Sequence, residues 1–94
     1  MRTFKWDESK NKTNQKDHGI SFETAQLVFD DPLHLTIVEN VKDGEERWHA
    51  IGMVGTVALL LVVHTYMEDG ANEVIRIISC RQASKHERKL YEEG

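Results

Sequence analysis

A set of cations and hydrogen-bonding groups falls near the ends of predicted strands and on the first predicted helix. Such a set is what cleavage of RNA without a metal requires. The 2′-hydroxyl must lose a proton, fixed positive charge must stabilise the phosphorane, and the leaving 5′ oxygen must gain a proton. The set alone is weakly specific, because small domains routinely contain several arginines and a histidine. Its members are Arg47, Arg76, Arg81, His64, Lys10 and Asn14.

Arg76 is the most unusual member, because it lies within the run 74–81, which is rich in β-branched and apolar residues. Alternate residues of a regular strand share a face, so Arg76 and Cys80 are expected on one face and Arg81 on the other. Burial of a guanidinium without a partner is costly. Arg76 is therefore expected either to pair with a carboxylate or to face a ligand, and the sequence leaves both open.

The sequence gives little support for a metal site or for a nucleophilic cysteine. No two histidines are spaced i, i+3 or i, i+4, and none belongs to a Cys/His motif, so no metal site or cofactor is predicted. Cys80 lies in an apolar strand and is predicted to be a core residue instead of a nucleophile. The histidines are His18, His34, His49, His64 and His86.

The composition is that of one small soluble domain spanning residues 1–94. Hydrophobic residues make up 39% of the 94 positions and charged residues 30%. The longest apolar run, 57–63, is too short to span a bilayer, and the N-terminus lacks the apolar core of a signal peptide. A single cysteine permits no internal disulfide, so the cytoplasm is the expected compartment.

Charge is unevenly distributed along the chain. The formal net charge is −4, but residues 1–20 and 76–94 each carry five Lys or Arg against three Asp or Glu. Residues 21–75 carry two against ten. If the two ends meet in space, a basic surface is possible on an acidic protein.

These groups must be positioned by a small set of predicted elements. A short strand at 3–6 is followed by a polar helix at 8–16, with Asp7 as N-cap and Gly19 as the stop signal. Ser21 caps a second helix, which ends before Pro32. A last helix is expected at 83–92.

The middle of the chain alternates with the period of a strand. Strands are predicted at 33–38, 46–53, 56–66 and 74–81, with turns at 41–44, 54–55 and 68–72. The second places Arg47, His49, Ile51 and Met53 on one face. The third is apolar on both faces and should be central. The prediction is an α+β fold: a four-stranded antiparallel meander plus a short N-terminal strand, two N-terminal helices and one C-terminal helix.

The ordered series of motifs resembles the BrnT family of bacterial type II toxins along nearly the whole chain. At the start of the chain, the matching residues are Phe4 to Asp7, Lys10, Asn14 and His18 to Phe22. In the middle, they are Phe29 to Pro32, Glu46-Arg47 and Val63 to Thr65. At the end, they are Arg76 to Ser79, Arg81, Glu87-Arg88 and Tyr91. The series is specific, although no single piece of it is. Asp17 is a departure, since the family usually has a lysine there.

The resemblance implies a RelE-like fold and a cytoplasmic toxin that cleaves RNA and halts translation. It also implies a BrnA-type antitoxin that covers the toxin and carries a ribbon-helix-helix domain. Through that domain the pair would bind operator DNA, and the expected assembly is a heterotetramer of two toxins and two antitoxins.

The resemblance also suggests residue roles. Arg47 and Arg81 would hold the scissile phosphate, and Arg76 would stabilise charge. His18 and His64 are candidates for proton transfer.

Further positions are expected to contact RNA or to support the site. Lys10, Asn14 and Lys16 would contact the RNA backbone. Tyr91 and Glu87 would support the site, and a salt bridge from Glu87 to Arg76 or Arg81 is the preferred interpretation.

Two other functions are weighed against the nuclease. In the first, the chain is a non-catalytic binding module whose basic face only grips the antitoxin. In the second it is a DNA-binding repressor by itself, which is disfavoured because no predicted helix has the necessary density of basic residues.

Overall fold

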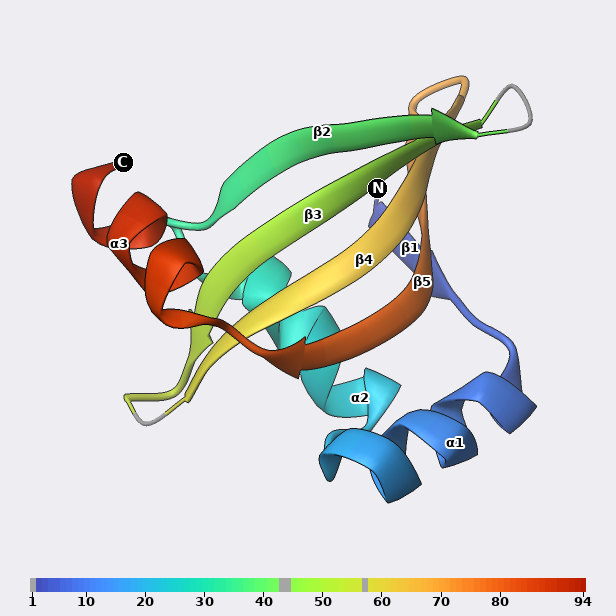
Figure 1. Ribbon diagram of the computed structural model, residues 1–94. Coiled ribbons are helices and arrows are strands. Elements are labelled where there is room, and N and C mark those ends of the chain that lie inside the picture. Colours follow the sequence, from blue (N-terminus) through green and yellow to red (C-terminus); the bar gives the residue numbers. More distant parts are fainter. Residues whose placement is uncertain (1, 43–44, 57) are drawn as a thin grey trace.

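A computed structural model describes residues 2–42, 45–56 and 58–94 of the chain. Its centre is one five-stranded sheet in the order β1-β5-β4-β3-β2 (Figure 1). The strands are β1 (Arg2–Lys5), β2 (Leu35–Lys42), β3 (Glu45–Val54), β4 (Ala58–Asp69) and β5 (Asn72–Gln82). Strands β2 to β5 form the predicted antiparallel meander. The short N-terminal strand pairs parallel to β5, so the complete sheet is mixed.

The helices are α1 (Glu8–His18), α2 (Phe22–Ala25), the 3₁₀ helix η1 (Gln26–Asp30) and α3 (Lys85–Glu93). Both predicted capping residues of α1 are confirmed, although the helix continues to His18 instead of ending at 16. The Asp7 side chain accepts the Ser9 N–H, and Gly19 adopts φ 71°, a left-handed conformation that suits glycine. The second predicted helix is shorter than expected, because the chain tightens into η1 after Ala25.

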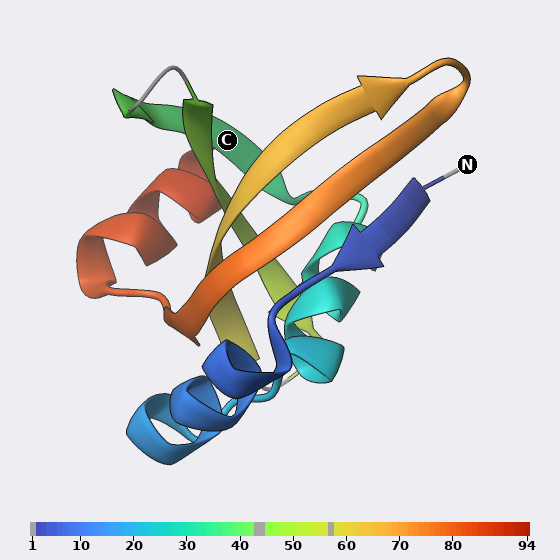
Figure 2. The same ribbon diagram turned by 90° about the vertical axis from the view of Figure 1, so that its right-hand side faces the viewer.

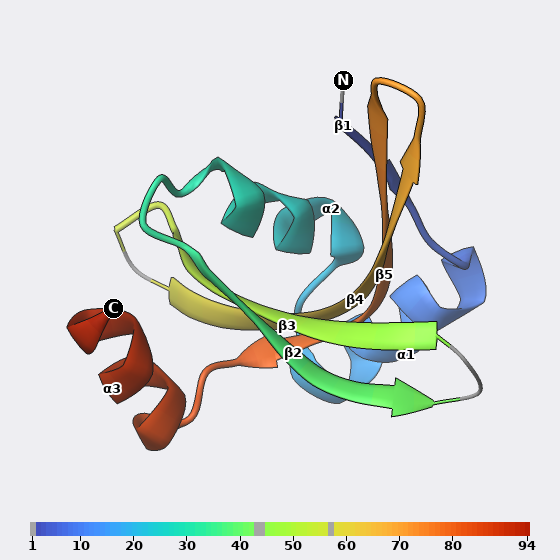
Figure 3. The same ribbon diagram turned by 90° about the horizontal axis from the view of Figure 1, so that it is seen from above.

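The helices cover the two faces of the sheet unequally (Figures 1 and 3). Helices α2 and η1 pack against one face, on β5 and β3, and enclose the main core. Gly52 of β3 permits this contact, since a Cβ there would lie 2.9 Å from Val28 Cγ1. Helix α3 covers only one end of the other face, over Ile51, Leu59 and Leu61. None of the described helices covers the rest of that second face.

The central position predicted for the most apolar strand is confirmed, since β4 lies between β3 and β5. Leu60 and Val62 enter the main core, while Leu59 and Leu61 belong to the smaller cluster under α3. The strand also extends to Asp69, into the predicted turn at 68–72, and the predicted turn at 41–44 lies partly outside the described residues.

Helix α1 lies along the part of β5 that β1 leaves uncovered (Figure 2). Asn14 makes the attachment. Its Nδ2 donates to the Cys80 carbonyl at 2.8 Å and to the Ile20 carbonyl at 2.9 Å, and its Oδ1 accepts the Cys80 N–H at 3.1 Å. The carboxamide thus binds both backbone groups of Cys80 as a neighbouring strand would.

Candidate functional site

A β-bulge in β5 changes the predicted directions of two arginines. Val63 pairs with Ser79 but His64 pairs with Ile77, so Ile78 is the extra residue on β5. Arg76 and Arg81 therefore lie on the same face, not on opposite faces. The expectation was wrong because it assumed unbroken alternation through the run 74–81.

Arg47 shares this face. His49 pairs with Val63, and Arg47 is two residues before His49 on β3, so both side chains lie on the same side of the sheet. Thr65, two residues after Val63, pairs with Arg76. The three arginines thus come from two strands on either side of β4.

We call this uncovered surface the open face, meaning the part of the α3 side of the sheet that α3 does not cover. Its polar members come mainly from β2, β3, β4 and β5 (Figure 1), and Glu87 of α3 joins it through its ion pair with Arg81. They include Glu39, Arg47, His49, Thr65, Arg76, Ser79, Arg81 and Glu87, with Lys5 of β1 beside Arg76.

Arg81 forms a bidentate ion pair with Glu87. Its Nη1 and Nη2 donate to Glu87 Oε1 and Oε2, each at 2.8 Å. Glu87 also accepts the Ser84 N–H, which completes the capping box of α3. Hydrogen bonding to Arg81 lowers the pKa of Glu87 to about 2, so the carboxylate stays charged. The predicted salt bridge of Glu87 is therefore present, and its partner is Arg81.

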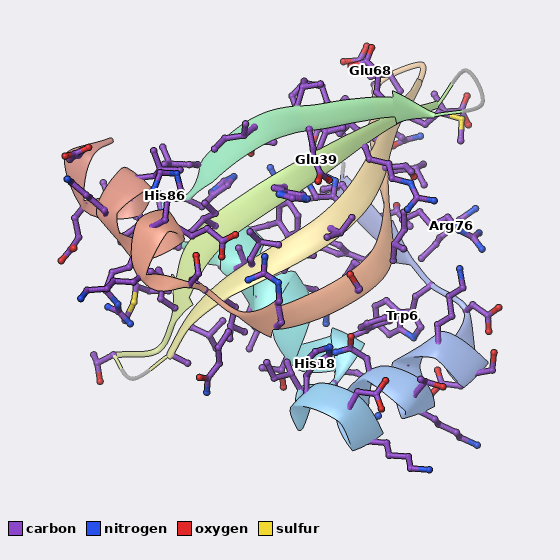
Figure 4. The ribbon with its side chains drawn as sticks, in the orientation of Figure 1. Trp6, His18, Glu39, Glu68, Arg76 and His86 are labelled. Carbon is purple, nitrogen blue, oxygen red and sulfur yellow. The ribbon has the colours of Figure 1, made fainter. Side chains whose placement is uncertain are left out.

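A second pair, between His49 and Glu39, was not predicted as part of the site. His49 Nε2 contacts Glu39 Oε2, with 20% and 50% of the respective side chains exposed. Glu39 is the extra residue of a bulge in β2, between Val38 and Asn40. Figure 4 shows Glu39 in front of the sheet, on the open face. Strand alternation already placed His49 beside Arg47, but nothing local in the sequence indicates the bulge.

Arg76 is exposed and lies at the far side of the open face. It lines a hollow of about 640 Å³ with Lys5 and Thr65 at the β4–β5 hairpin. In Figure 4 its side chain extends past the edge of β5, away from Glu39. No carboxylate within the described residues forms an ion pair with it.

The structure does not bring His64 to this site. Its side chain enters the opposite face, where the residue is 1% exposed. The ring packs edge-on against Phe29 at 5.0 Å between centroids, and Nδ1 lies 3.1 Å from the Thr65 carbonyl oxygen. Burial lowers the pKa of His64. The imidazole is thus separated from the arginines by the sheet.

The candidate site residues of α1 are the three predicted RNA contacts, Lys10, Asn14 and Lys16, and the proton-transfer candidate His18. Asn14 is 6% exposed, and its carboxamide is engaged with backbone groups. Lys10, Lys16 and His18 are exposed. Lys10 and His18 line a hollow between α1 and Ser79 of β5. The exposed candidates Lys10 and His18 therefore lie beside the open face, together with Asp17 of the same helix.

Tyr91 is occupied at the end of the sheet. Its hydroxyl donates to Asp31 Oδ2 at 2.6 Å, and the same oxygen accepts the Met53 N–H. Asp31 Oδ1 accepts the Leu33 N–H. Tyr91 thus fixes α3 to the segment that enters β2.

Cys80 behaves as the core residue that was predicted. It is 1% exposed, and burial raises the pKa of its thiol to about 12. No group of three or more potential metal ligands occurs in the part of the chain that the structure describes. None of the described helices is long and apolar enough to cross a membrane.

Comparison with known proteins defines the class to which this fold and open face belong. A family model described as the ribonuclease toxin, BrnT, of type II toxin-antitoxin systems matches residues 6–87. The domain is therefore a toxin of the type II class. Within that class, the chain belongs to the BrnT family.

A solved structure agrees with the family assignment. The chain is similar to the 1.1 Å crystal structure of the Brucella abortus ribonuclease toxin, BrnT, with 32% sequence identity and a TM-score of 0.61. The match covers 90% of this chain and 99% of the other. No match was found among curated proteins.

Proposed function

We propose that this chain is a metal-independent endoribonuclease that arrests translation in the cytoplasm. The observation that carries the proposal is that Arg47, Arg76 and Arg81 share one uncovered face of the sheet. Three guanidinium groups beside a solvent-accessible surface provide the fixed positive charge that a phosphodiester and its phosphorane need. The family name, ribonuclease toxin, supports the same chemistry.

The arginines would have different tasks. Arg81 presents two N–H groups along one edge to Glu87, which fixes the direction of its guanidinium. Such a fixed arginine suits the scissile phosphate, with Arg47 approaching from β3 on the other side of β4. Arg76 is exposed at the far side of the open face, where it would bind a phosphate of the RNA next to the scissile one and add positive charge. Lys10, Lys16 and His18 would extend the track along α1.

The partner would be a BrnA-type antitoxin with a ribbon-helix-helix domain. The type II assignment of the family supports a protein antitoxin. Covering the open face would block RNA, and dimerisation through the ribbon-helix-helix domains would give two toxins and two antitoxins. Operator DNA would contact the antitoxin only, since the toxin has a net charge of −4.

The test is cleavage of single-stranded RNA by the purified chain, with and without a chelator. Cleavage should continue in EDTA. Arg47→Ala and Arg81→Ala should each reduce it by roughly 10²- to 10³-fold, the usual cost of removing one group that stabilises developing charge. Arg88→Ala, which removes an exposed arginine of α3, is the matched control and should cleave normally.

Circular dichroism and thermal unfolding must accompany these variants, because Arg81→Ala leaves Glu87 without its cation. Arg81→Lys keeps the charge and loses the bidentate geometry, so it should retain the fold with low activity. Tight antitoxin binding with no cleavage by the wild type would overturn the nuclease and favour the non-catalytic binding module.

A further inference from the structure

The open face contains one histidine whose ring is held in place by a carboxylate. His49 lies on β3 in register with Val63, and Val63 is in register with Ser79. Two residues along each strand, on the same face, Ile51 of β3 and Leu61 of β4 are in register with Arg81 of β5. The row that contains His49 is therefore next to the row that contains Arg81.

Arg76 completes the arrangement on the other side. It pairs with Thr65, two residues beyond Val63 on β4, and Arg47 is two residues before His49 on β3. The histidine row thus lies between the row of Arg81 and the row of Arg47 and Arg76. Neighbouring rows on one face are roughly 7 Å apart, a distance that long arginine side chains span.

The contact with Glu39 determines which nitrogen of His49 can act as a base. An ionised carboxylate only accepts hydrogen bonds, so the Nε2 that contacts Glu39 Oε2 must carry a hydrogen. In the neutral ring Nδ1 then holds the free lone pair. No partner of Nδ1 occurs within the described part of the chain, and the side chain remains 20% exposed.

We propose that His49 is the catalytic base of this nuclease and that Glu39 is its positioning residue, an inference that rests on the proposed function. Nδ1 takes the proton of the 2′-hydroxyl, and the 2′ oxygen forms a bond to phosphorus. The bond from phosphorus to the 5′ oxygen breaks, its electron pair stays on that oxygen, and the oxygen takes a proton from water. The products are a 2′,3′-cyclic phosphate and a 5′-hydroxyl, and the proton on His49 returns to the resulting hydroxide.

Glu39 also affects Arg81 electrostatically. Its negative charge is one of those that raise the pKa of Arg81, after the hydrogen bond and charge of Glu87, so the two pairs lie near each other. The charged side chains of the open face around His49 come from several elements. They are Glu39 on β2, Arg47 on β3, Arg81 on β5 and Glu87 on α3, with Arg76 of β5 at the far side of the face.

The experiment measures single-turnover cleavage of single-stranded RNA as a function of pH, in parallel with binding of 2′-O-methyl RNA of the same sequence. His49→Gln should reduce the cleavage rate by roughly 10²- to 10⁴-fold, the usual contribution of a general base, and leave binding of the modified RNA unchanged. His86→Gln changes an exposed histidine of α3 and is the matched control. It should cleave at the wild-type rate.

Glu39→Gln tests the positioning role. A glutamine amide can donate to Nε2 and stabilise the other tautomer, which leaves Nδ1 protonated and unable to accept a proton. This variant should lose roughly 10-fold or more in rate and shift the acid limb of the pH–rate profile, whereas a merely structural role would leave that limb in place. Because half of the Glu39 side chain is exposed, the variant should fold even if His49→Gln does not.

The outcomes separate this inference from the proposed function. If wild type does not cleave RNA, the proposed function fails. If wild type cleaves and Arg81→Ala does not, but His49→Gln and Glu39→Gln keep the wild-type rate and pH profile, the proposed function stands and the roles given to His49 and Glu39 are wrong.

Discussion

The imidazole of His64 is a buried ionisable group that packs against the main core. It lies edge-on to Phe29, and its Nε2 is buried without a hydrogen-bond partner among the described residues. Protonation would place a positive charge in this apolar position, where burial opposes it. His64 is therefore better understood as a core residue that is sensitive to acid than as a group that transfers protons to RNA.

His64 should make the protein less stable in mild acid. Its folded-state pKa lies below the ordinary value of 6.5, so the unfolded chain binds a proton that the folded chain does not. The free energy of unfolding should consequently fall as pH decreases below 6.5, by up to about 1.4 kcal/mol per pH unit. Urea unfolding of wild type and His64→Phe between about pH 7 and pH 5 measures this, and the variant should lose less stability.

His86→Phe serves as the control, because that exposed histidine should leave the pH dependence as in wild type. Equal pH dependence of wild type and His64→Phe would show that His64 does not account for the acid sensitivity.

At the scale of elements, the edge of β5 is completed by two different partners. Strand β1 pairs with Glu73 to Arg76, and the carboxamide of Asn14 then binds the N–H and carbonyl of Cys80. A polar helix with few apolar side chains is otherwise weakly attached. Asn14 solves this by replacing apolar packing with hydrogen bonds to buried backbone groups.

Asn14→Ala should therefore destabilise the fold. The substitution leaves the Cys80 N–H, the Cys80 carbonyl and the Ile20 carbonyl without the partner that they have now. Each buried unsatisfied group costs about 1–3 kcal/mol, and since water can reach part of this edge, we expect a total of about 2–4 kcal/mol. Chemical denaturation measures the loss, with exposed Lys12→Ala on the same helix as the control.

This experiment also decides the RNA contact predicted for Asn14. If Asn14→Ala unfolds at the wild-type denaturant concentration but loses RNA affinity, the carboxamide serves RNA instead of the β5 edge.

The elements that could be predicted are those specified by neighbouring residues. Asp7 and Gly19 set the ends of α1 through contacts within a few positions, and both capping residues are confirmed. The bulges at Ile78 and Glu39 depend on how strands pair and twist, so no local pattern indicates them. The position of Arg76 on the same face as Arg81 and the His49–Glu39 contact both follow from these bulges. This is why the arginines and the shared face of Arg47 and His49 could be predicted from the sequence, while the shared face of Arg76 and Arg81 and the carboxylate partner of His49 could not.

At the scale of the whole molecule, an acidic protein must attract a polyanion through a local surface. The net charge is −4, and the carboxylates of Glu39 and Glu87 stand among the arginines of the open face. Long-range attraction of RNA should therefore be weak. Binding should depend on a small number of direct phosphate contacts that displace counterions.

The number of those contacts can be measured from the salt dependence of RNA affinity. Each phosphate neutralised on a single strand contributes about 0.7 to the slope of log Kd against log salt concentration. Contacts from Arg47, Arg76 and Arg81 should therefore contribute about 2 to the slope, beyond any contribution from Lys10 and Lys16 of α1, and replacing any one of these arginines by alanine should lower the slope by about 0.7. Fluorescence anisotropy with 2′-O-methyl RNA, which resists attack from the 2′ position, provides the measurement. Arg88→Ala should retain the wild-type slope, so a loss as large as that of Arg47→Ala would show that RNA contacts α3 instead of the open face.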